Sequence, residues 1–151
     1  MSTEGNKTLV TKLLKGFNEA LKGDDIDAFL EKFVSNDFIC HDPVTGEGDL
    51  EALEIEIKEL RDAFPDLEWT VEDMIAEGDK VVVRVMHRAK HQGEFMGIKP
   101  TGKEVIYGGI VIFRVKDGKI AEEWVYSDYL GLMQQLGVIP PPIGVSRNVT
   151  C

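Results

Sequence analysis

The stretch "KEVIYGGIVIFRVKDGKIAEEWVYSD", residues 103–128, decides the fold. Two runs rich in β-branched and aromatic residues flank its central Asp117-Gly118, and an Asp-Gly pair between such runs is the strongest short-range signal for a β-hairpin. Residues 67–77 and 80–90 form a similar pair of runs around Gly78-Asp79, which also suits a two-residue turn. The second half of the chain therefore predicts two antiparallel hairpins.

The first half of the chain has the spacing of amphipathic helices. Apolar residues recur every three or four positions over residues 10–21, 26–33 and 50–64. Pro65 ends the last of these runs, because proline has no N–H to donate and clashes with the preceding turn. Helices followed by hairpins predict an α+β fold, with the helices covering one face of a curved antiparallel sheet. Such a sheet can fold around a pocket.

Composition excludes several classes of function. The chain has 151 residues, so we expect one domain, over residues 1–138. Its formal net charge is −10, so we expect neither nucleic acid nor a membrane surface as a partner. Residues 139–151 contain three consecutive prolines and are predicted to form an extended tail. The stretch "MSTEGNKTLV" lacks the features of a signal peptide, and we expect a cytoplasmic protein. The cysteines and histidines have no metal-ligand spacing, so we expect no metal.

The second hairpin suggests which side chains meet. With a regular turn at Asp117-Gly118, Tyr107 faces Asp128, while Trp124 and Tyr126 point to the same side of the sheet. A β-bulge would shift this register by one residue. A carboxylate among aromatic rings loses solvation, which raises its pKa and suits general acid–base catalysis. Asp128 is therefore a candidate catalytic residue, although it could also simply cap the helix that follows.

Other polar residues have two interpretations each. Asp73 falls opposite Arg84, so Arg84 either pairs with Asp73 or lines the pocket and binds a ligand oxygen. His41 precedes an Asp-Pro pair and His91 opens a glycine-rich segment, and each is either structural or substrate-binding. His87 falls on the sheet face away from Arg84 and is predicted to be a surface residue.

The glycine-rich segment 91–102, "HQGEFMGIKPTG", is predicted to form a loop at the rim of the pocket. Its apolar side chains, Phe95, Met96 and Ile98, should turn inward. Leaving a large apolar side chain exposed forgoes roughly 1.5–3 kcal/mol of burial.

Four stretches resemble the SnoaL-like polyketide cyclase family of the nuclear transport factor 2-like superfamily. They are "HDP" (41–43), "FPDLEWTVEDMIAEGDKVVVR" (64–84), "HQGEFMGIKPTGKEV" (91–105) and "IFRVKDGKIAEEWVYSDYLGLMQQLG" (112–137). The resemblance covers about residues 8 to 138. It implies a cone-shaped α+β barrel with a deep apolar pocket, and a homodimer or higher homo-oligomer packed through the sheet.

The resemblance also implies an activity. Characterised cyclases of this family close the last ring of an aromatic polyketide ester by an intramolecular aldol condensation, without a metal or organic cofactor. Their acid–base group is an aspartate after the Trp of the final strand, a position that falls on Asp128 here. The implied partner is a small apolar carbonyl compound, with these residues as candidates for binding it: His41, Arg84, His91, Tyr107, Trp124 and Tyr126. A binding protein without turnover, or a hydratase or isomerase, would use the same pocket.

Overall fold

The computed structural model describes residues 2–23 and 25–141, in which four helices and six strands form. The helices are α1 (Thr3–Ala20), α2 (Ile26–Phe33), α3 (Leu50–Ala63) and α4 (Tyr129–Leu136). The strands are β1 (Val34–Asp42), β2 (Gly46–Gly48), β3 (Glu68–Glu77), β4 (Lys80–Lys90), β5 (Glu104–Lys116) and β6 (Lys119–Ser127). The predicted tail reaches this description only at residues 139–141, and the rest of it lies outside the described residues.

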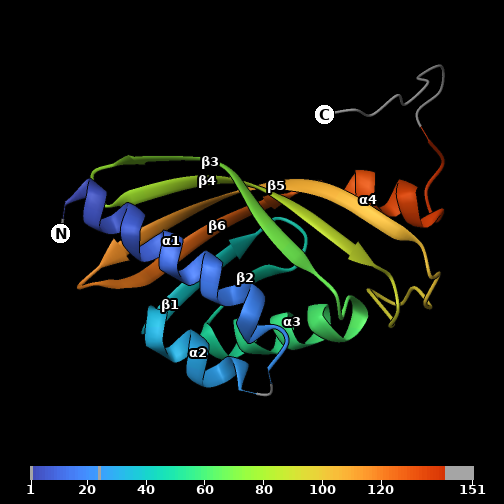
Figure 1. Cartoon of the computed structure of the whole chain (residues 1–151), viewed down its shortest axis with the longest axis horizontal. Coiled ribbons are helices and arrows are strands. Elements are labelled where there is room, and N and C mark those ends of the chain that lie inside the picture. The colour runs from blue at the N-terminus through green and yellow to red at the C-terminus, as the bar shows by residue number, and fades with distance from the viewer. Residues whose placement is uncertain (1, 24, 142–151) are drawn as a thin grey trace.

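All strands belong to one curved sheet with the order β2-β1-β6-β5-β4-β3. Helices α1, α2 and α3 cover its concave side, and α4 packs against β5 at one end of the sheet (Figure 1). The α+β class and the curved sheet are confirmed, and four of the five strand pairs are antiparallel as predicted, whereas β1 runs parallel to β6. No hairpin turn connects those two strands, so nothing local in the sequence set their relative direction.

Aspartates begin the helices that frame the cavity side of the fold. The side chains of Asp25, Asp49 and Asp128 each accept a hydrogen bond from a backbone N–H three residues further on, at 2.8–3.0 Å. Such caps satisfy one of the free N–H groups of a first helical turn and typically contribute about 1 kcal/mol. The capping role considered for Asp128 is therefore confirmed. Within the described ranges no helix is long and apolar enough to cross a membrane.

A β-bulge at Ala121 sets the register of β5 and β6. Lys116 faces Lys119 as predicted, but Arg114 faces Glu122 and Gly109 faces Ser127, so the predicted register is wrong by one residue beyond the bulge. The extra residue reverses which side chains of β6 point inward, because side chains alternate between the two faces of a strand.

A second bulge, at Glu72, changes the first hairpin in the same way. Asp73 lies opposite Arg84 in the strand register, as predicted, but Trp69 lies opposite His87 rather than Arg88. His87 therefore lies beside Trp69 on the concave face. The prediction that His87 is a surface residue is wrong, because its side chain is buried.

The loop over residues 91–103 lies at the mouth of the concave side, as predicted. The backbone N–H groups of Gln92 and Gly93 both donate to the Ala63 carbonyl at the end of α3. A Cβ at Gly93 would lie 2.2 Å from the Asp62 carbonyl oxygen, so only glycine allows this contact. The three apolar side chains of the loop behave differently from one another. Phe95 and Ile98 pack against the core, whereas Met96 is 54% exposed at the rim.

Candidate functional site

A cavity of about 670 Å³ lies between the helices and the concave face of the sheet. This volume is typical of a site for a small organic molecule. Its walls are mainly apolar side chains from α1, α2, α3 and the inner positions of the strands, including Leu13, Leu14, Phe17, Leu30, Leu53, Ile57, Leu60, Val85, Val111, Phe113 and Val125. The prediction of an apolar pocket closed by the N-terminal helices is confirmed.

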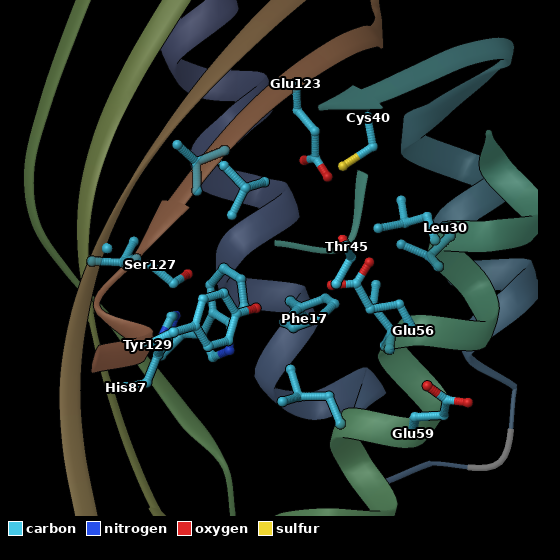
Figure 2. A pocket seen from close by; sticks show the side chains of 18 of the residues that line it. Phe17, Leu30, Cys40, Thr45, Glu56, Glu59, His87, Glu123, Ser127 and Tyr129 are labelled. Atoms are coloured by element: carbon cyan, nitrogen blue, oxygen red, sulfur yellow. The ribbon is translucent and has the colours of Figure 1, made fainter. Parts of the chain in front are cut away.

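Polar side chains interrupt these walls in two places. Figure 2 shows Glu123 and Cys40 pointing toward each other from β6 and β1, with Glu56 of α3 nearby. His87 and Tyr129 lie together on another part of the wall. The cavity thus combines apolar surface with a small number of groups that can exchange protons or donate hydrogen bonds.

Among the carboxyl groups that line the cavity, Glu123 has the pKa that is raised most. The bulge at Ala121 turns it inward, and the residue is 9% exposed. Burial raises the pKa of its carboxyl from an ordinary 4.5 to about 7; a hydrogen bond with Cys40 lowers it in part, and the charges of Glu56 and Asp42 raise it further. Both the acid and the carboxylate are therefore populated at neutral pH, which suits a group that takes up and returns a proton.

The two neighbouring carboxyl groups have different surroundings. Asp42 is buried at the end of β1, where it accepts hydrogen bonds from the backbone N–H groups of Val44 (2.7 Å) and Thr45 (3.2 Å). It therefore holds the turn into β2. Glu56 lines the cavity, and burial, followed by the charge of Asp42, raises its pKa.

His87 lies in the cavity wall between two aromatic rings. Its ring centroid is 4.5 Å from that of Trp69 and 4.6 Å from that of Tyr107. Burial lowers the pKa of the imidazole from 6.5 to about 4, so the ring is neutral at pH 7.

Tyr107 is the predicted site residue that does line the cavity. Burial raises its pKa, so its hydroxyl stays protonated and able to donate a hydrogen bond. Tyr129, at the start of α4, was not predicted; it also lines the cavity, and burial raises its pKa as well.

The other predicted residues of the sheet lie on its convex face. Trp124 and Tyr126 pair with Ile112 and Ile110 there, because the bulge in β6 reversed their direction. Arg84 is exposed on the same face, while Asp73 accepts a hydrogen bond from the backbone N–H of Met74 at 2.9 Å. The prediction that Trp124, Tyr126 and Arg84 line the pocket is therefore wrong.

Asp128 also lies outside the main cavity. It is exposed and borders a separate shallow depression that includes Arg84 and Tyr126. Its Oδ1 accepts the hydrogen bond from Gly131 that caps α4. The prediction that Asp128 shares a pocket floor with Trp124 and faces Tyr107 is wrong for the same reason, the shifted register.

The two remaining histidines hold structural positions. His41 stacks on Trp124 with centroids 5.3 Å apart, and its Nε2 lies 2.8 Å from Glu122 Oε2 on the convex side. His91 is fully buried, and its Nδ1 accepts a hydrogen bond from the backbone N–H of Thr101 at 3.1 Å. His91 therefore joins the two ends of the loop, and neither histidine lines the cavity.

An NMR titration of the histidine rings should distinguish the two faces of the sheet. The His41 pKa is raised above 6.5, chiefly by its hydrogen bond with Glu122, whereas burial lowers that of His87 to about 4. We expect the Cε1–H chemical shift of His41 to titrate with a midpoint above pH 6.5. That of His87 should stay constant as the pH is lowered to about 5. Spectra of His41→Gln and His87→Gln would assign the two signals. A His87 signal that titrates near 6.5 would contradict its burial.

A small α+β fold whose curved sheet and helices surround an apolar cavity with a buried carboxyl group is typical of proteins that bind small molecules. Within this class, the family model described as "SnoaL-like polyketide cyclase" matches residues 11–136. The chain belongs to this family.

Curated relatives and solved structures agree with this assignment. Aklanonic acid methyl ester cyclase DnrD of Streptomyces peucetius is 29% identical over 133 residues, covering 85% of this chain and 88% of the relative. The corresponding cyclase DauD of Streptomyces sp. (strain C5) is 27% identical over 132 residues, covering 85% and 80%.

Among solved structures, AclR of Streptomyces galilaeus, described as a candidate hydroxylase, has a TM-score of 0.82 at 30% identity and covers 93% of this chain and 86% of its own. IdmH of Streptomyces antibioticus, described as a candidate polyketide cyclase, has a TM-score of 0.76 at 30% identity, covering 88% and 99%.

Proposed function

We propose that the protein is a cofactor-independent cyclase that closes a ring in a small apolar carbonyl compound, with Glu123 as the group that transfers protons. The observation that carries this proposal is the position of Glu123: a buried carboxyl group with a pKa of about 7 in the wall of an apolar cavity. A pKa near the working pH is the best compromise for a group that must act as both base and acid.

The proposed reaction needs no oxidant or other co-reactant. The Glu123 carboxylate removes a proton from a carbon next to a substrate carbonyl, which leaves an enolate. The enolate carbon attacks a second carbonyl carbon of the same molecule, so that one C–C bond forms and one C=O π bond becomes an alkoxide. The alkoxide takes the proton back from the Glu123 acid, and the product is an isomer of the substrate.

The cavity supports this chemistry in two further ways. Its apolar walls exclude water, which strengthens each hydrogen bond to a developing negative charge. The hydroxyl groups of Tyr107 and Tyr129 stay protonated, and they are the donors that we assign to the enolate or alkoxide oxygen. Asp128, which the family resemblance implied for proton transfer, is exposed and caps α4, so we assign that role to Glu123.

The direct test uses the substrate in the names of the curated relatives. Incubation of the full chain with aklanonic acid methyl ester should give a product of unchanged mass and altered chromatographic retention. A heat-denatured sample is the control. Binding of this ester without conversion would favour the alternative, a ligand-binding protein. The absence of a cofactor and the cytoplasmic location stay predictions.

The convex face of the sheet supports a homodimer. Large apolar side chains are exposed across three neighbouring strands of this face, where Ile39, Ile106, Ile110 and Tyr126 lie. Large apolar side chains exposed together on one face favour an interaction site, and the family resemblance implies packing of copies through the sheet.

Charge on this face should separate the two copies. Ile110 is 45% exposed near the middle of the convex face, so Ile110→Asp would place a carboxylate in the interface at little cost to the monomer. We expect light scattering to give twice 16.9 kDa for the unaltered chain and 16.9 kDa for the variant. Val44→Asp, in an exposed turn, is the control. An unaltered chain that is monomeric at high concentration would refute the dimer.

A further inference from the structure

Three polar atoms in one part of the cavity wall lack a hydrogen-bond partner. They are both ring nitrogens of His87 and the indole Nε1 of Trp69, and all three are buried. The two rings pack at 4.5 Å, and both residues line the cavity. Buried polar groups in native proteins are rarely left unpaired, so three together require an explanation, and a ligand that supplies the missing partners is one.

The chemistry of these atoms restricts the ligand. A neutral imidazole has one N–H donor and one nitrogen acceptor, and the indole Nε1 is a further donor. One hydroxyl group can donate to the acceptor nitrogen of the imidazole and accept from the indole N–H, which pairs two of the three atoms. A carbonyl oxygen would satisfy the donors but leave the acceptor unpaired.

The surroundings restrict the ligand further. Phe17 packs edge-to-face on Trp69 at 4.9 Å, and Tyr107 packs on His87, so the walls beside the unpaired atoms are aromatic. In the described part of the chain the cavity is lined by carboxyl groups, including Glu56, and by no lysine or arginine. The aromatic walls favour a planar ring, and the carboxyl groups disfavour a negative charge on that ring.

We infer that His87, together with the Trp69 indole N–H, binds the hydroxyl group of a neutral phenol or ring enol and so determines the orientation of the substrate. This assignment rests on the proposed function only in using the same cavity. It adds to that function a specificity-determining residue, His87, which performs no proton transfer.

The test compares two probes that differ by one donor. 1-Naphthol carries a ring hydroxyl, and 1-methoxynaphthalene has the same ring with the hydroxyl hydrogen replaced by methyl. We expect calorimetry on the full chain to show about tenfold tighter binding of 1-naphthol, the size of one well-placed hydrogen bond. His87→Phe, which keeps an aromatic ring without nitrogens, should abolish the preference, and His87→Gln, which keeps a donor and an acceptor, should retain part of it.

A measurement on the unaltered chain removes dependence on the variants' folding. The ¹⁵N shifts of the His87 ring should change on addition of 1-naphthol and not of 1-methoxynaphthalene. Equal affinity for the two probes, no binding of either, a preference that survives His87→Phe, or unchanged ¹⁵N shifts would each overturn the assignment. Glu123→Gln should keep the preference for 1-naphthol, so a failure of this assignment is distinguishable from a failure of the catalytic role of Glu123.

Discussion

Replacing Glu123 with Gln should lower the rate of ring closure by about 10²- to 10⁴-fold, the usual contribution of one general acid–base group. Gln has the same shape and keeps a hydrogen-bonding group, but it cannot take up the substrate proton. Glu123 lies in the cavity wall beside Cys40, and Gln fills the same space there. The substitution should therefore change substrate binding little. The measurement is the rate of product formation at saturating substrate, with the dissociation constant obtained separately.

Two other carboxyl groups serve as controls for that experiment. Glu59→Gln removes a charge from an exposed lining residue on α3 and should leave the rate close to that of the unaltered chain. Asp128→Asn keeps the helix cap, because Asn caps as well as Asp, and it should also keep the rate. An inactive Asp128→Asn protein beside an active Glu123→Gln protein would return the proton-transfer role to Asp128.

The same substitution, Glu123→Gln, should stabilise the folded protein at alkaline pH. Below pH 4.5 the carboxyl is protonated in the folded and unfolded chain alike. Between pH 4.5 and about 7 only the unfolded chain gives up the proton, so the free energy of unfolding falls as the pH rises. At about 1.4 kcal/mol per pKa unit, the full cost above pH 7 is about 3 kcal/mol. Gln does not ionise, so the variant avoids this cost.

Urea unfolding at pH 4.5 and pH 8 would measure this effect. We expect the stability difference between Glu123→Gln and the unaltered chain to favour the variant by about 3 kcal/mol more at pH 8 than at pH 4.5. Glu59→Gln, at an exposed position, should show little such change. A difference that is independent of pH would mean that the Glu123 pKa is ordinary, which would also remove the main support for its catalytic role.

Local sequence signals determined the class of fold and the positions of its elements. Asp117-Gly118 and Gly78-Asp79 do form the predicted hairpins, and aspartates such as Asp49 begin helices where apolar spacing changes to a helical period. These features depend on residues that are close together in the chain, through turn geometry, capping and burial of one helix face. The apolar cavity follows from them, since helices that cover a curved sheet on its concave side enclose space.

Tertiary structure decided which side chains of β3 and β6 face that space. The bulge at Ala121 moved Glu123 inward and Trp124 outward, and the bulge at Glu72 placed Trp69 opposite His87. Side chains alternate between the two faces of a strand. One extra residue at a bulge therefore moves every later side chain of that strand to the opposite face. The run "KIAEEWVY" contains no glycine or proline that would mark such a site, and the parallel pairing of β1 with β6 depends on packing between distant segments. For these reasons the class of fold could be derived from the sequence, whereas the carboxyl group that enters the cavity could not.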